Sequence, residues 1–154
     1  MPRSNRTARN RTARNKSRKT GKLKTSKPTV HQIFFNIGKG ELREIPIFYK
    51  CYQSNKDYCK KHRLNYKLWT RSQVEDLLKK PHNKEYQGVY QAFSQDIMRI
   101  DFAKYMILWN FGGIYIDLDI QIMKGFSIKP LFEKDEFFVR WHDNKLPYNA
   151  ILGT

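Results

Sequence analysis

The segment from residue 94 to residue 120 constrains the fold of this chain more than any other. Apolar residues recur with helical spacing through residues 94–110, and Gly112 then supplies the left-handed residue that commonly follows a helix. The sequence I-Y-I-D-L-D-I at residues 114–120 follows at once and predicts a strand. A helix that leads through two glycines into an apolar strand indicates an α/β domain.

The rest of the chain repeats this alternation of strands and helices. T-V-H-Q-I-F-F at residues 29–35 predicts a first strand, residues 44–62 a helix with Pro46 in its first turn, and residues 65–69 a second strand. Ser72 and Glu75 are spaced as a capping box ahead of a short helix. Residues 136–141 predict a further strand. Alternation of this kind is typical of an α/β fold with a largely parallel sheet.

The first thirty residues differ in composition from the rest. They contain eleven Lys and Arg and no Asp or Glu, so they carry +11 of the formal net charge of +16. Arg6 to Asn15 is a tandem repeat, R-T-A-R-N-R-T-A-R-N, with almost no large apolar side chains. Such a segment cannot bury enough surface to fold, so we predict a disordered basic tail at residues 1–28 and a folded domain at residues 29–154.

The basic tail has several readings. It would attract nucleic acid or an anionic membrane surface through counterion release, and it could equally be a solvated or targeting arm. No apolar run approaches the roughly 20 residues that span a bilayer, and the N-terminus has no signal-peptide pattern. Cys51 and Cys59 are too few for a disulfide scaffold. We therefore expect a cytoplasmic protein with reduced thiols.

The two carboxylates within residues 114–120 require an explanation. Side chains alternate across a strand, so Tyr115, Asp117 and Asp119 should share the face opposite the aliphatic residues. Two like charges about 7 Å apart repel, and a divalent cation beside them relieves that repulsion. Mg²⁺ and Mn²⁺ favour such oxygen ligands and share them with substrate phosphates. The alternatives are an exposed edge strand, a calcium site or a haloacid-dehalogenase-type phosphatase; Gln121 disfavours the last, because Thr or Val stands there in that class.

The preceding helix contributes a second polar pair. Asp101 lies sixteen residues before Asp117, and Lys104 shares its helix face at i+3. A carboxylate and an ammonium group beside a metal-binding strand could hold sugar hydroxyls. The alternative is an ordinary ion pair on a helix surface, which contributes only tenths of a kcal/mol.

These residues resemble a known family. The stretch R-I-D-F-A-K-Y-M-I-L-W-N-F-G-G-I-Y-I-D-L-D is similar to the D-x-D sugar-binding region of glycosyltransferase family 32. That group is similar to fungal initiating mannosyltransferases and, more distantly, to clostridial glucosylating toxins. The opening K-P-T-V-H-Q-I-F-F is similar to the first strand of that family, usually P-K-x-I-H-Q-I-W. The resemblance covers the chain from about Pro28 to its last residue, and because relatives of the family occur in giant DNA viruses, it implies a cytoplasmic or virus-associated protein.

The resemblance implies a GT-A-like, Rossmann-like domain that transfers a hexose from a UDP- or GDP-sugar to a glycan or protein acceptor, with Mn²⁺ or Mg²⁺ and retention of configuration. By position, Asp119 would be the main metal ligand, and Asp117 would contact the ribose or act through water. The other residues implied for the donor sugar and nucleotide are Asp101, Lys104, Ile33, Phe34, Tyr115 and Gly113.

The sequence also departs from the family pattern. Lys104 replaces the more usual Arg, and Phe34 stands where a stacking Trp is usual. The chain stops at N-A-I-L-G-T, where the family continues with acceptor contacts, so we expect a C-terminally incomplete domain. The alternative function is nucleic-acid binding through the basic tail, carried on a catalytically degenerate scaffold.

Overall fold

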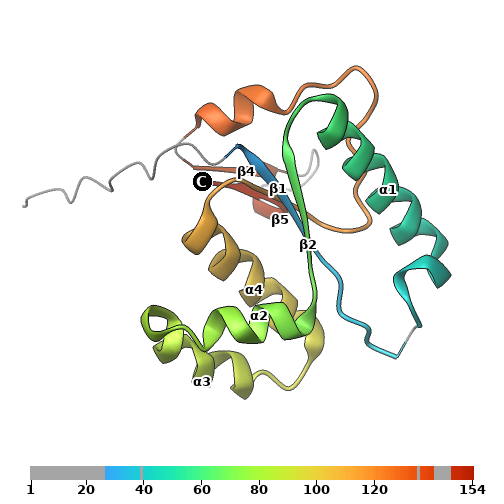
Figure 1. The fold of residues 1–154 in the computed structure, drawn as a ribbon. Helices are drawn as coiled ribbons and strands as arrows, with labels where there is room; N and C mark the ends of the chain where they lie inside the picture. The colour runs from blue at the N-terminus through green and yellow to red at the C-terminus, as the bar shows by residue number, and fades with distance from the viewer. Residues whose placement is uncertain (1–26, 39, 135, 141–146) are drawn as a thin grey trace, which may run out of the picture.

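The computed structural model describes residues 27–38, 40–134, 136–140 and 147–154 (Figure 1). The predicted disordered tail at residues 1–28 therefore lies almost entirely outside the described residues. Among the described residues, no helix is long and apolar enough to cross a membrane.

The centre of the fold is a five-stranded sheet in the order β2-β1-β3-β5-β4. β1 pairs in parallel with both β2 and β3, whereas β5 pairs antiparallel with β3 and with β4. The strands are β1 (Thr29–Ile33), β2 (Asn65–Trp69), β3 (Ile114–Ile116), β4 (Phe137–Arg140) and β5 (Pro147–Gly153). The parallel part, β2-β1-β3, is the part that the alternating sequence pattern predicted.

Helices cover both faces of the sheet (Figure 1). One face carries α1 (Pro46–Lys61), which begins at Pro46 because proline at the first helical position loses no hydrogen bond. The other face carries α2 (Arg71–Leu78), α3 (Lys84–Ala92) and α4 (Asp96–Phe111). Short 3-10 turns lie at Leu42–Glu44, Pro81–Asn83 and Lys129–Glu133. The α/β class expected from the sequence is confirmed.

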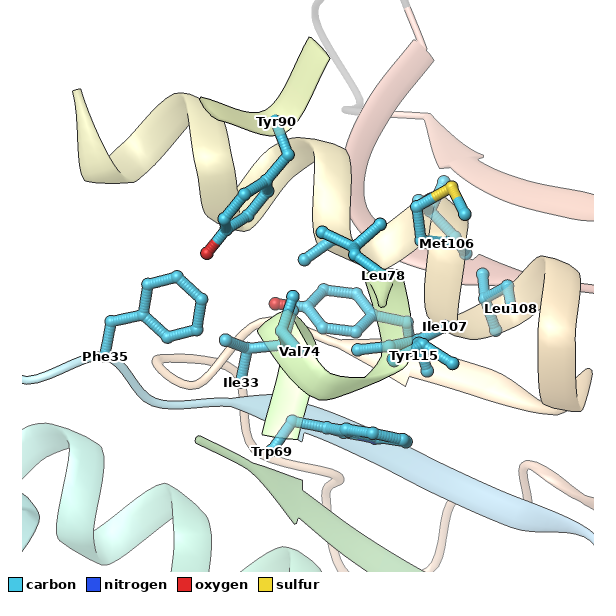
Figure 2. Packing of buried hydrophobic residues seen from close by; sticks show 13 residues of the cluster. Ile33, Phe35, Trp69, Val74, Leu78, Tyr90, Met106, Ile107, Leu108 and Tyr115 are labelled. Carbon is cyan, nitrogen blue, oxygen red and sulfur yellow. The ribbon is translucent and has the colours of Figure 1, made fainter. Parts of the chain in front are cut away.

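Alternate residues of the strands pack into two separate hydrophobic cores, one on each face of the sheet. Ile33 of β1 and Tyr115 of β3 pack with Val74, Leu78 and residues of α4 on one face (Figure 2). Val30, Ile114 and Ile116 pack on the other face with Cys59 of α1. The alternation predicted for residues 114–116 is therefore present, with the aliphatic side chains turned toward α1.

Several local predictions are wrong in detail. The strand expected at residues 114–120 ends at Ile116, because the chain then turns and leaves the sheet. The capping box is made by Thr70 and Gln73 rather than by Ser72 and Glu75, so α2 begins two residues earlier. Neither α3 nor β5 was expected from the sequence.

The turn between α4 and β3 needs both of its glycines. Gly112 has φ +63° and Gly113 has φ +95°, and both values lie in the region that favours glycine. A Cβ at Gly113 would lie 2.5 Å from the carbonyl oxygen of Thr29. Beside this turn, buried His31 contacts the Gly112 carbonyl oxygen through Nε2 at 3.1 Å and accepts from Trp69 Nε1 through Nδ1 at 3.1 Å. Gly113 thus lets the chain that enters β3 approach β1 closely, while Gly112 supplies the backbone conformation that ends α4.

Candidate functional site

The two aspartates of the D-x-D motif lie in a turn directly after β3. The amide of Asp117 makes the last link to β5, donating to the Ala150 carbonyl oxygen at 2.7 Å. The amide of Ile120 then donates back to the Asp117 carbonyl oxygen at 3.1 Å and closes the turn. The prediction that strand alternation places Asp119 is therefore wrong. The turn places this residue instead, and it leaves the Asp119 side chain exposed.

A cavity of about 420 Å³ opens at this turn, at the carboxyl ends of β1 and β3. Seven of the eight site residues expected from the sequence line it. They are Ile33, Phe34, Asp101, Lys104, Tyr115, Asp117 and Asp119. Ligands of α/β proteins bind at the carboxyl ends of parallel strands, so this is the place where a ligand site is expected.

Gly113 is the predicted site residue that the structure does not bring to this cavity. It lies at the opposite end of β3, where its amide donates to the Thr154 carbonyl oxygen at 3.1 Å. Its close approach to Thr29 gives it a role in packing α4 and β3 against β1.

The ammonium group of Lys104 connects the carboxylates of the cavity. Its Nζ lies 2.7 Å from Asp101 Oδ1 and 3.0 Å from Asp117 Oδ1. The Lys104 side chain is only 3% exposed, whereas those of Asp101 and Asp117 are 42% and 25% exposed. The hydroxyl of Tyr115 also donates to Asp117 Oδ1, at 2.9 Å. The Asp101–Lys104 pair is therefore part of a partly buried network of four residues, Asp101, Lys104, Tyr115 and Asp117, and not a simple surface ion pair.

Burial and charge act against each other in this network. Burial raises the pKa of Asp117 by more than the neighbouring Lys104 ammonium lowers it. Burial alone would lower the pKa of Lys104, but its hydrogen bond to Asp101 and the charge of Asp117 outweigh that effect and raise it. Burial, followed by the charge of Asp117, raises the pKa of Tyr115 well above its ordinary value. At neutral pH Tyr115 is therefore a hydrogen-bond donor and Lys104 a cation.

The rest of the cavity wall is mostly apolar. Phe34 and Phe35 follow β1, Ile45 and Phe48 come from the start of α1, and Ile97 comes from the start of α4. A flat aromatic group would be desolvated against this wall, while charged or hydroxyl groups would lie at the acidic end. Pockets that combine an apolar wall with a few convergent polar groups are typical small-molecule sites.

The carboxylates fit an open metal site and do not fit a closed one. Within the described part of the chain, no three His, Cys, Asp or Glu side chains are grouped to hold a metal ion. Asp119 and Asp117 could supply oxygen ligands to Mg²⁺ or Mn²⁺, which usually take their remaining ligands from water and substrate phosphates. Asp117 Oδ1 already accepts from Lys104 and Tyr115, so Asp119 is the better placed of the two for direct coordination.

Polar side chains that were not predicted from the sequence hold the turn from outside the cavity. Gln32 of β1 donates from Nε2 to the Asp117 carbonyl oxygen at 3.0 Å, and the Tyr66 hydroxyl donates to Gln32 Oε1 at 2.7 Å. Asn55 of α1 bonds to Ile120 and Ile122. The available signal was a glutamine inside an apolar strand and an asparagine on the buried face of a helix, because buried amides need partners.

Comparison with protein families decides which group of proteins this site belongs to. The family model described as a glycosyltransferase sugar-binding region containing a DXD motif matches residues 42–138, which include Asp117 and Asp119. The chain belongs to this family. The resemblance inferred from the D-x-D block is thereby confirmed, and glycosyl transfer is the activity that the family carries.

Two curated relatives agree with this assignment. The chain is 31% identical over 72 residues to inositol phosphoceramide mannosyltransferase 1 of Schizosaccharomyces pombe, a match that covers 47% of the chain and 22% of the relative. It is 30% identical over 98 residues to an uncharacterised glycosyltransferase of Acanthamoeba polyphaga mimivirus, covering 62% of the chain and 36% of the relative. The chain thus spans well under half the length of these relatives. No solved structure shows a significant match.

Proposed function

We propose that this chain binds a nucleotide-sugar together with Mn²⁺ or Mg²⁺ and transfers its hexose, with retention of configuration, to a hydroxyl group of an acceptor. The observation that carries the proposal is the cavity itself. It gathers three carboxylates, a buried ammonium group and an apolar wall at the carboxyl ends of two parallel strands. The proposal assigns residues 29–154 to one donor-binding, GT-A-like domain.

The apolar wall would hold the nucleoside. Ile33 and Phe34 line the cavity at the end of β1, where the nucleobase would lie. Phe34 is only partly buried, so its ring can contact a ligand. The volume of about 420 Å³ lies within the range of ligand pockets, roughly 300–1,000 Å³. UDP- and GDP-hexoses are therefore the donors to test.

The acidic end would hold the diphosphate and the sugar. Asp119 would bind the cation, and Asp117 would contact the ribose or join the cation through water. A bound Mn²⁺ or Mg²⁺ would neutralise the negative charge that develops on the departing diphosphate. Asp101 would accept hydrogen bonds from the sugar hydroxyls, while Lys104 fixes the positions of Asp101 and Asp117.

The acceptor is proposed as a glycan, a protein or a lipid-linked polyol. The last of these enters because one relative is named as a mannosyltransferase that acts on inositol phosphoceramide. The same name makes mannose the first hexose to test.

Thermal unfolding in the presence of nucleotide-sugars tests the proposal. Ligand that binds only the native state raises the unfolding temperature by mass action, so millimolar UDP- or GDP-hexose with Mn²⁺ should raise it. Chelator and Asp119→Ala should each abolish that rise. Asp57→Ala, an exposed carboxylate on α1, is the matched control and should keep it. A cooperatively unfolding wild type that no donor stabilises would overturn the proposal.

A further inference from the structure

The main chain that carries Asp119 has left the sheet. The β3–β5 register ends at Ile116, and the Asp117 amide makes the last bond to β5. On the other side, β1 pairs with β3 only at Ile114 and Tyr115. The peptide groups that follow Asp117 therefore depend on the turn and on side chains for their hydrogen bonds, because buried peptide groups need partners.

Asn55 supplies those hydrogen bonds from the middle of α1. Its Nδ2 donates to the Ile120 carbonyl oxygen at 2.8 Å, and its Oδ1 accepts from the Ile122 amide at 2.8 Å. One donor and one acceptor, directed at residues two apart, reproduce what a neighbouring strand would offer. The side chain of Asn55 thus takes the place of a strand beside the segment that follows Asp119.

The surroundings of Asn55 strengthen this contact. The residue is fully buried, at 0% exposure, and shares its helix face with Cys51 and Cys59, which are the other buried residues of α1. Cys51 Sγ lies 3.4 Å from the carbonyl oxygen of Asp119 itself. The buried face of α1 therefore makes hydrogen bonds to the main chain of Asp119, Ile120 and Ile122.

We propose that Asn55 is a positioning residue for Asp119: by bonding Ile120 and Ile122 it fixes the turn in which the Asp119 carboxylate can hold a divalent cation. The inference rests on the proposed function, which makes Asp119 the metal ligand. Groups that orient a metal ligand commonly change metal affinity by 10- to 100-fold when they are removed.

Asn83 provides a matched control for the loss of a buried amide. It is also 0% exposed, and its Nδ2 donates to the Leu77 carbonyl oxygen and to Asn110 Oδ1, both at 3.0 Å. These contacts join α2 to α4, and Asn83 is not among the residues that line the cavity. Asn83→Ala therefore removes a similar set of hydrogen bonds without touching the turn.

The first experiment measures Mn²⁺ affinity by electron paramagnetic resonance of the free ion, in the presence of UDP or GDP, below the unfolding temperature of every variant. Asn55→Ala should weaken Mn²⁺ binding by about 10-fold or more. Asn83→Ala should stay within about twofold of wild type, although both variants unfold at lower temperature. If Asn55→Ala does not fold, Asn55→Ser, which keeps a hydroxyl group, replaces it.

A second measurement separates this inference from the proposed function. Amide hydrogen exchange in residues 118–122 should become faster in Asn55→Ala and stay unchanged in Asn83→Ala. A wild type that binds Mn²⁺ and an Asn55→Ala variant that binds it equally well would overturn the inference and leave the function standing. A wild type that binds no Mn²⁺ would overturn the function and, with it, the role of Asn55 toward a metal. Unchanged exchange would overturn the positioning of the turn itself.

Discussion

The two ends of β3 bury polar groups in opposite ways. At the amino end, His31 is buried without charge, and its two ring nitrogens contact the Gly112 carbonyl oxygen and the Trp69 indole. At the carboxyl end, Lys104 and Asp117 are drawn into a charged network that borders a cavity. Three residues of strand separate a neutral, closed arrangement from a charged, open one.

This difference indicates which end is structural and which is functional. Closed polar contacts between neutral groups stabilise packing, because every donor has an acceptor. Partly burying charges beside a cavity costs desolvation free energy, and carboxylates with perturbed pKa values in a cleft are typical of functional sites. The contacts of Gly113 and His31 are those of a packed structural element, and the charged groups at the cavity support the proposal that Asp117 and Asp119 bind a ligand.

Gly113→Ala should cause the largest loss of stability, because it disrupts the close packing at the amino end of β3. The methyl group would meet the Thr29 carbonyl oxygen at 2.5 Å, and alanine would be strained at φ +95°. Strain and overpacking together should lower the free energy of unfolding by about 4 kcal/mol, measured by urea denaturation. Gly125→Ala, at φ +90° with open space around it, should cost only about 1 kcal/mol. Equal losses in the two variants would contradict the packing role of Gly113.

Lys104→Met should destabilise the carboxyl end of β3, because it removes the ammonium group that contacts the carboxylates of Asp101 and Asp117. Removal of one member of a buried ion pair costs about 3 kcal/mol, the low end of the usual range, since Asp101 and Asp117 keep some contact with solvent. The pKa of Asp117 should rise further. Lys79→Met is the control, because Lys79 forms an exposed i,i+3 pair with Asp76 and should change stability little. A Lys104→Met protein as stable as Lys79→Met would show that the ion pairs of Lys104 contribute no more to stability than an exposed pair.

Low pH should reduce the free energy of unfolding, because buried His31 at the amino end of β3 would have to bind a proton. Burial lowers the pKa of His31 from 6.5 to about 4, so the native state binds its proton less readily than the unfolded state. The stability that this group contributes is present above pH 6.5 and is lost as the pH falls toward 4, by about 3 kcal/mol. Urea denaturation at pH 7 and pH 4 should show a smaller loss in His31→Gln than in wild type. An equal loss in both proteins would exclude a neutral buried His31.

Asp119→Asn should have the smallest effect on stability. The side chain is exposed on the turn, so the free energy of unfolding should change by less than about 0.5 kcal/mol. Its metal-dependent binding of nucleotide should nevertheless be lost, as calorimetric titration with UDP or GDP and Mn²⁺ would show. A variant that keeps that binding would separate Asp119 from the site.

The sequence allowed prediction of those parts of the fold that depend on local periodicity. The regular spacing of apolar residues in α4 and the β-branched and aromatic residues of β1 marked these elements within a few residues. α3 contains Gly88 and lacks a side-chain N-cap, so its helical state depends on packing around Tyr90. β5 begins with a proline and is defined as a strand by its pairing with β3 and β4, which the residues of β5 alone do not indicate.

The residues of the candidate site also fall into those that the sequence predicts and those that it does not. Asp101, Lys104, Asp117 and Asp119 could be named in advance, because their residue types and spacing carry chemistry. The end of β3 at Ile116 and the support from Gln32 and Asn55 could not, since those contacts join residues 65 to 85 positions apart. Local patterns identify the groups that could react, whereas long-range contacts determine how the groups are held.

Anomalous scattering from manganese would show directly whether Asp119 binds the cation. Crystals of the full chain grown with Mn²⁺ and the nucleotide that stabilises it should show a manganese peak within about 2.2 Å of an Asp119 carboxylate oxygen, with the nucleotide beside Phe34. A manganese peak on other residues, or nucleotide bound away from the cavity at the carboxyl end of β3, would contradict the account.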